Sequence, residues 1–182
     1  KRQKQHTQMV QALKKCDKIY LESYTVDFPY TIKELEKVIN KPIAPLGREP
    51  VENEKFIEEA KKSNIALLVY GSPLSATTHI SLLLKCKKEK IPYKVFQNAS
   101  ILGAIAETGL QLYKFGKTAS MPKWSPSHKP TSFMNIIKEN QSIKAHTLLL
   151  TDIGLYSKTA LQQLQETSAS HLPNKVLIVS SA

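Results

Sequence analysis

Residues 65–79, which read IALLVYGSPLSATTH, indicate the fold more clearly than any other stretch. The unbroken apolar run of residues 65–70 is typical of a strand that is buried on both faces of a sheet. Gly71, Ser72 and Pro73 end that strand, and a helix is predicted from about Thr77 to Lys90. The side chains expected to face inward from this helix are Ile80, Leu83 and Leu84.

Strand and helix patterns alternate on both sides of this stretch. Further helices are predicted near residues 9–16, 32–39, 56–60, 132–138 and 158–165, and one begins near Ile101. Further strands are predicted at residues 18–21, 93–97, 146–151 and 176–179. Such alternation predicts an α/β protein with a mainly parallel sheet. Because the pattern begins with a helix, we expect that the first strand of the sheet is missing.

Residues 121–130 contain three prolines and the only tryptophan, a composition that predicts a linker. We therefore expect an N-terminal α/β domain at residues 1–120 and a partial C-terminal α/β domain at residues 121–182. No internal repeat is evident.

Several classes of site are excluded by the residue pattern. Cys16 and Cys86 are far apart and neither belongs to a CxxC pair, so neither a zinc site nor a disulfide framework is expected. The five histidines are scattered, and the GxSxG, GxxxxGKS and HExxH motifs are absent. We therefore assign no catalytic residue and no metal. No apolar run approaches the roughly 20 residues of a membrane span, and the basic start lacks the apolar region of a secretory signal.

The net charge of +11 is concentrated in one third of the chain. Residues 85–144 contain eleven lysines against three glutamates, a surplus of +8. The lysines form no tight run, and no aromatic-rich RNA-binding motif accompanies them, so direct binding to nucleic acid is not expected. Two interpretations remain open: a solvated lysine-rich surface, or a docking face for an acidic or ribosome-associated partner.

Two strand-to-helix junctions, residues 69–79 and 95–101, have the composition of a ligand site. In open α/β sheets ligands bind beyond the carboxyl ends of the strands. Small residues let a ligand approach the backbone, and a helix N-terminus offers free N–H donors. Gly-Ser-Pro after a strand is also an ordinary turn, so a ligand site and a structural turn both remain possible interpretations.

Seven segments in order resemble the diphthine synthases, a family with the tetrapyrrole methylase fold. Residues 71–79 resemble its GDPxxATTH motif and residues 109–118, GLQLYKFGKT, its GLQLYxFGxT motif. The remaining matches are residues 20–25 (YLESYT), 91–93 (IPY), 98–101 (NASI), the W…PxSF pattern of Trp124, Pro130, Ser132 and Phe133, and 146–148 (HTL).

The resemblance implies two α/β domains, a homodimer, and S-adenosyl-L-methionine bound between the domains. It implies methylation of the diphthamide precursor on the modified histidine of elongation factor 2, in the cytoplasm. The positions that match the family's cofactor contacts are Ser72, Ser75, Ser100, Ile101 and Thr151. A methyltransferase of this kind needs little acid–base machinery, because the sulfonium of the donor is already an activated electrophile.

The sequence also departs from the family pattern. Ser72 stands where the family has aspartate, and a neutral serine is a weaker hydrogen-bond acceptor than a carboxylate. The family's opening strand and glycine-rich loop are absent before Lys1, and its pattern continues beyond Ala182. Two alternatives therefore stay open. One is a catalytically silent homologue that acts as a binding or dimerisation module. The other is a superfamily methyltransferase for ribosomal RNA or a tetrapyrrole.

Overall fold

The computed structural model describes residues 2–26, 28–167 and 176. The chain forms two compact units, residues 1–100 and residues 101–182. The boundary between the units lies before the predicted domain boundary at residue 120, and that domain assignment stays a prediction. Among the helices within the described residues, none has the length and apolar character that crossing a bilayer requires.

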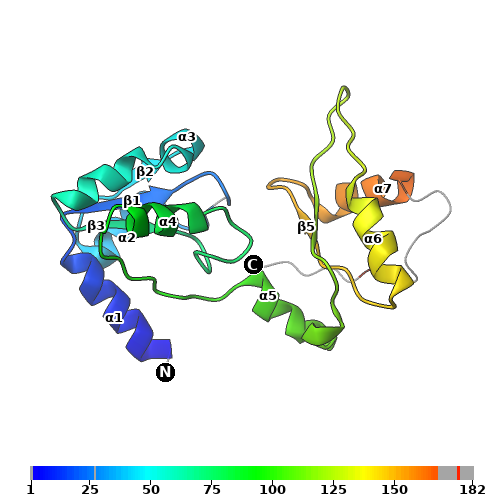
Figure 1. Ribbon diagram of the computed structural model, residues 1–182, viewed down its shortest axis with the longest axis horizontal. Coiled ribbons are helices and arrows are strands. Elements are labelled where there is room, and N and C mark those ends of the chain that lie inside the picture. The colour runs from blue at the N-terminus through cyan, green and yellow to red at the C-terminus, as the bar shows by residue number, and fades with distance from the viewer. Residues whose placement is uncertain (1, 27, 168–175, 177–182) are drawn as a thin grey trace. The chain divides into compact units, whose positions relative to one another are not determined.

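The first unit is built on a three-stranded parallel sheet (Figure 1). Its strands are β1 (Lys18–Glu22), β2 (Ala44–Leu46) and β3 (Ile65–Leu68), and β1 lies between the other two. In the register Leu21 of β1 lies opposite Pro45 of β2 and Leu68 of β3. All three strands therefore end at one edge of the sheet, and the predicted parallel α/β arrangement is confirmed.

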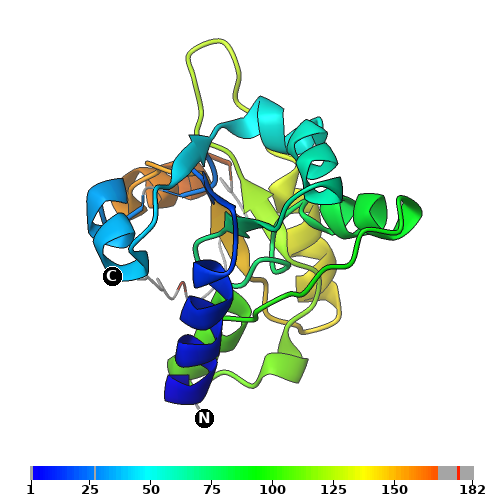
Figure 2. The same ribbon diagram turned by 90° about the vertical axis from the view of Figure 1, so that its left-hand side faces the viewer.

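Successive side chains of β1 point to opposite faces of the sheet, and helices pack against both faces. Ile19 and Leu21 pack with buried residues of α1 (Arg2–Lys14) and α2 (Ile32–Ile39). Tyr20 packs on the other face, with buried residues of α3 (Arg48–Glu52), the 3-10 helix η1 (Lys55–Lys61) and α4 (Ile80–Lys88). In Figures 1 and 2, α1 (blue) projects from the sheet, and Met9 and Leu13 of its last turns pack in this core.

The limits of α2 follow from its capping residues. Thr31 is the N-cap: its hydroxyl accepts from the Glu34 N–H, and the Glu34 carboxylate accepts from the Thr31 N–H, which is a capping box. Asn40 ends the helix in the left-handed conformation, with φ 59°. These contacts hold α2 at the position where Ile39 enters the core.

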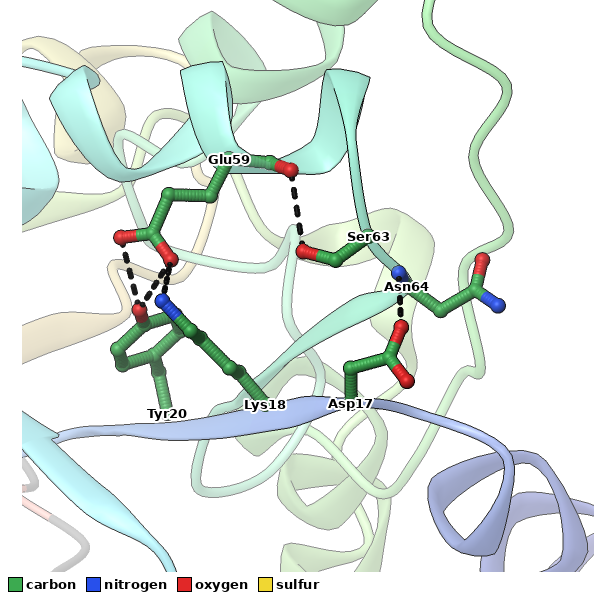
Figure 3. Close-up of polar contacts among 6 residues, drawn as sticks. All are labelled: Asp17, Lys18, Tyr20, Glu59, Ser63 and Asn64. Carbon is green, nitrogen blue, oxygen red and sulfur yellow. Dashed lines mark hydrogen bonds and ion pairs between the residues drawn. The ribbon is translucent and has the colours of Figure 1, made fainter.

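The amino-terminal edge of the sheet is closed by polar contacts (Figure 3). The Glu59 carboxylate of η1 accepts a hydrogen bond from the Tyr20 hydroxyl at 3.0 Å and pairs with Lys18. The Asn64 N–H donates to the Asp17 carboxylate at 2.8 Å, which joins the start of β1 to the start of β3. The hydrogen bond from Lys18, and then that from Tyr20, lowers the pKa of Glu59. The polar contacts at this edge therefore have a structural role: they connect β1 to η1 and to the start of β3.

The second unit contains a two-stranded parallel sheet of β4 (Ala119–Met121) and β5 (Leu149–Thr151). Its helices are α5 (Ile101–Ala104), α6 (Phe133–Ser142), α7 (Ser157–Thr167) and the 3-10 helices η2 (Ile105–Thr108) and η3 (Leu112–Lys114). Met121, Phe133, Ile137 and Leu164 are among the buried side chains of its core, which lies between the strands and the helices α6 and α7.

The structure corrects four of the predictions. Residues 93–97 form no strand, because a strand requires a hydrogen-bonded neighbour and none of the described strands pairs with this segment. The predicted helix at residues 56–60 is a 3-10 helix. Residues 121–130 are not a linker. They lie inside the second unit as a hairpin, with backbone hydrogen bonds between Ser125 and His128 (Figure 1, yellow-green).

The fourth correction concerns the inward face of α4. Ile80 and Leu84 are more than half exposed, whereas Leu82 is buried against Val51 and Ile57. The helix begins at Ile80 and not at Thr77. The face of α4 that packs on the core carries Leu82 and Cys86, one turn apart, so the predicted inward face of Ile80 and Leu84 is wrong. The predicted strand at residues 176–179 lies outside the described residues except for Val176, which is in no strand.

Candidate functional site

The segment after β3 bends sharply at Gly71. Gly71 has φ +80°, and a Cβ at this position would lie 3.2 Å from the carbonyl oxygen of Ala99. Only glycine adopts this backbone conformation readily, and only glycine leaves room for the close approach of the second segment. The two predicted junctions of the first unit, residues 69–79 and the segment that reaches Ser100, are therefore adjacent in the structure.

A short chain of side-chain hydrogen bonds joins these two segments. The Ser75 hydroxyl donates to the Ser72 hydroxyl at 2.9 Å, and Ser72 donates to the Gln97 side-chain oxygen at 3.1 Å. Ser72 is buried and Gln97 is exposed. The amide nitrogen of Gln97 and the lone pairs of Ser75 are the two ends of this chain, and both are suited to bind a polar ligand.

The five predicted cofactor contacts are divided between the two units. Ser72 and Ser75 are in direct contact, as predicted for one site. Ser100, which is partly buried, ends the segment that Gln97 and Ala99 anchor beside Gly71. Ile101 begins α5, and Thr151 is the exposed last residue of β5, both in the second unit. The role of all five residues as cofactor contacts stays a prediction.

The loop after β1 meets the loop after β3 at the same edge of the sheet. Glu22, 1% exposed, accepts hydrogen bonds from the backbone N–H groups of Tyr24 and Thr25 at 2.8 Å each. This buried carboxylate fixes the turn that starts the loop. Further along the loop, the Phe28 ring packs edge-on against Tyr70, with 5.2 Å between centroids.

Two buried side-chain polar atoms have no hydrogen-bond partner among the described residues: the Tyr24 hydroxyl and Nε2 of His79. Burial raises the pKa of the Tyr24 phenol, and the Glu22 and Glu52 carboxylates raise it further. The Arg48 guanidinium lies over the Tyr24 ring, 5.0 Å from its centroid. Buried polar groups are nearly always paired, so these two atoms are exceptions to that rule.

Sequence reasoning missed three residues of this region. The sequence gives His79 and Tyr24 only as parts of the resembling segments 71–79 and 20–25, and Gln97 only as the end of a predicted strand. The position of Gln97 at the end of a segment near the sheet edge was the available signal. The unpaired atoms of Tyr24 and His79 depend on tertiary packing, and no sequence pattern reveals them.

The site has the chemistry of a binding surface. Its side chains are hydroxyls, an amide and buried, hydrogen-bonded groups, and no group of His, Cys, Asp or Glu within the described residues has the geometry to hold a metal ion. Such a surface orients a bound molecule through hydrogen bonds and leaves the reactivity to the molecules that it binds.

Proteins of similar sequence share one name, although no family model matches the chain. A diphthine methyl ester synthase of Schizosaccharomyces pombe is 41% identical over 146 residues, which are 79% of this chain and 52% of the relative. The diphthine methyl ester synthase of Homo sapiens is 36% identical over 175 residues, which are 95% of this chain and 61% of the relative. The chain thus spans between half and two thirds of the length of these curated relatives.

Solved structures agree with this relationship. A crystal structure of a diphthine synthase matches with a TM-score of 0.78 and 33% identity, over 88% of this chain and 64% of that one. A protein from Entamoeba histolytica that is assigned as a diphthine synthase matches with a TM-score of 0.74 and 36% identity, over 88% and 65%. These matches and the parallel sheets define an α/β protein with the tetrapyrrole methylase-like fold. Within that fold, the chain belongs to the diphthine synthase family.

Proposed function

We propose that this protein is an S-adenosylmethionine-dependent methyltransferase that acts on the diphthamide precursor of elongation factor 2. The observation that carries the proposal is the identity of 36% over 175 residues with a diphthine methyl ester synthase. The name of that relative describes a methyl ester, so we include ester formation among the proposed reactions. The proposal also includes a cytoplasmic homodimer, as the family resemblance implies.

The hydrogen-bonded chain of Ser75, Ser72 and Gln97 supports a polar cofactor at this edge of the sheet. S-adenosylmethionine supplies an activated methyl group when it is bound. In the proposal, Ser75 and Gln97 bind hydroxyl, ammonium or amide groups of the cofactor through the free ends of their hydrogen-bonded chain. Gly71 contributes by leaving the backbone of residues 97–99 close to these side chains. The residues thus orient the cofactor and take no part in proton transfer.

The surplus of lysines in residues 85–144 supports an acidic or ribosome-associated partner, and we propose elongation factor 2. Lys87, Lys88 and Lys90, at the end of α4 in the first unit, are all exposed. Lys85 on the same helix instead pairs with Glu58 and Glu89 and is therefore neutralised locally. The proposed docking contribution of the first unit comes from the three exposed lysines.

Transfer of a labelled methyl group tests the proposal. The protein is incubated with radiolabelled S-adenosylmethionine and with elongation factor 2 whose modification was arrested before methylation. We expect label on the factor, and none on a factor whose modified histidine is replaced. A folded protein that binds the cofactor but transfers no label to the factor would contradict the assigned substrate. A protein that also fails to bind the cofactor would contradict the methyltransferase class.

A further inference from the structure

The outward face of α4 in the first unit carries two large apolar side chains one turn apart. Ile80 and Leu84 are 53% and 61% exposed, and their spacing places them side by side on the helix surface. A surface helix normally presents polar side chains to water. A single exposed apolar residue, such as Val38 of α2, is common, but among the described helices only α4 has two such side chains one turn apart. This face therefore has the composition of a contact surface.

Two lysines continue the same row of side chains. Lys87 and Lys88 follow Leu84 at the i+3 and i+4 positions, and both are exposed. Neither forms an ion pair with a described residue. Ile80, Leu84, Lys87 and Lys88 thus form an outward stripe of α4 that is apolar at the start of the helix and positively charged at its end.

The opposite face of α4 is fixed to the rest of the first unit. Leu82 and Cys86 pack in the core between the sheet and the helices. Lys85 and Glu89 pair with side chains of η1, and Lys85 lies 3.3 Å from the Glu58 carboxylate. Because apolar and ionic contacts both hold this face, they determine the rotation of α4 about its axis and keep the outward stripe in contact with solvent.

The chemistry of the outward stripe matches an amphipathic helix with carboxylates beside its apolar residues. Side chains at i and i+4 form a ridge, which packs into the groove of a second helix. The two lysines complement acidic side chains. RNA matches the stripe less well, because Ile80 and Leu84 offer neither hydrogen bonds nor an aromatic face on which a base could stack.

We propose that the outward stripe of α4 is a docking surface for an acidic amphipathic helix of the protein substrate. Ile80 and Leu84 are its apolar anchors, and Lys87 and Lys88 supply the charge. This inference rests on the proposed function, since it takes elongation factor 2 as the protein that carries the acidic helix. It adds the contacts that hold the two proteins together: charge acts at long range and speeds encounter, whereas apolar contacts form at close range and slow dissociation.

The binding kinetics of the double variant Ile80→Ser/Leu84→Ser test the docking surface. Both side chains are exposed, so the fold should be kept, which a thermal melt checks. Surface plasmon resonance with immobilised elongation factor 2 gives the two rates. We expect dissociation to become about tenfold faster, because apolar anchors act mainly on the dissociation rate. The association rate, its salt dependence and the binding of S-adenosylmethionine should stay unchanged.

Val38→Ser is the matched control. It makes the same kind of change at an exposed aliphatic residue of α2, which is 63% exposed, and should leave both rates unchanged. A parent protein that binds the factor while the double variant dissociates no faster than the parent would overturn this inference alone. A parent protein that does not bind the factor would contradict the proposed partner and the inference with it.

Light scattering on the same samples distinguishes a second copy of the chain as the occupant. We expect the parent protein and the double variant to have the same mass in solution. If the double variant loses self-association but keeps the parent rates with the factor, the outward stripe contacts another copy of the chain, and the proposed docking surface is wrong.

Discussion

Buried polar side chains occur in both units, but they are used differently. In the second unit, Asn140 is 1% exposed and Gln163 is 4% exposed, and both the oxygen and the nitrogen of each amide are hydrogen-bonded. In the first unit, the 4% exposed His79 has one ring nitrogen without a partner, and the Tyr24 hydroxyl is also unpaired. Paired groups of this kind hold loops in place, as Glu22 (1% exposed) also does in the first unit, and the unpaired atoms of Tyr24 and His79 are exceptions to the rule that buried polar atoms are paired.

Asn140 is an example of a buried polar side chain that holds a loop in place. Its oxygen accepts from the Lys117 N–H at 2.9 Å, and its nitrogen donates to the Lys117 carbonyl at 2.8 Å and to Thr147 at 2.9 Å. A Cβ at Gly116 would overlap this amide, with the Asn140 Cγ only 2.7 Å away. Gly116, in the GLQLYKFGKT segment, thus makes room for the Asn140 amide, which joins α6 to the segment before β4.

The largest effect is expected for Asn140→Leu. The change leaves the N–H and carbonyl of Lys117 without partners, and each unsatisfied buried group costs about 1–3 kcal/mol. We expect a loss of about 3 kcal/mol in the free energy of unfolding, measured by urea denaturation. Ser142→Ala, which removes an exposed hydroxyl on the same helix, is the control and should cost less than about 0.5 kcal/mol. Equal losses for both variants would contradict the structural role of Asn140.

Ser72→Asp tests the first unit, because it adds a charged acceptor to the hydrogen-bonded chain of Ser75, Ser72 and Gln97. Ser75 already donates to position 72 at 2.9 Å, and the same hydroxyl is suited to donate to the new carboxylate. We expect binding of S-adenosylmethionine to strengthen about tenfold, since a hydrogen bond to a charged group is stronger than one between neutral groups. Calorimetry measures the affinity, and Ser63→Asp at the opposite edge of the sheet is the charge-matched control. Unchanged or weaker affinity would mean that position 72 makes no cofactor contact.

Charge reversal of Lys87, Lys88 and Lys90 tests the proposed docking face. We expect the rate of association with elongation factor 2 to fall several-fold at low salt, with a flatter salt dependence and unchanged cofactor binding. Stopped-flow measurements at low and high ionic strength give both quantities. The control reverses Lys33, Lys37 and Lys62, three exposed lysines elsewhere in the first unit. If both triple variants slow association equally, only the net charge matters and these lysines form no specific face.

A small, pH-dependent effect is expected for Glu89. Hydrogen bonds from Lys61, then from Lys85, lower the pKa of Glu89 to about 2. A carboxyl group whose pKa is lowered in the folded state stabilises the protein above its unfolded pKa, and this stabilisation is lost as the pH falls toward 2. Glu89→Gln should therefore lower the Tm by no more than about 3 °C at pH 7, and by less at pH 3. Calorimetric melts at both pH values provide the test, and an equal drop at both would contradict the ion-pair explanation.

The sequence predicted the parallel arrangement of the first unit and the positions of most helices, because apolar periodicity reflects burial directly. It failed where tertiary contacts decide. Residues 93–97 have strand composition but no pairing neighbour among the described strands, and the exposure of Ile80 and Leu84 depends on which face of α4 packs against the core. For the site, motif resemblance pointed to Ser72 and Ser75. The role of Gln97 and the unpaired Nε2 of His79 depend on three-dimensional contacts that no spacing rule contains.

Calorimetric titration of the unchanged protein with S-adenosylmethionine tests the central claim most directly. The hydrogen-bonded chain of Ser75, Ser72 and Gln97 predicts saturable heat with a Kd better than about 1 mM, and competition by the demethylated product. The same sample must show a cooperative unfolding transition, so that a negative result is not a consequence of misfolding. A folded protein that gives no saturable heat with either compound would contradict the assignment of this sheet edge as a cofactor site.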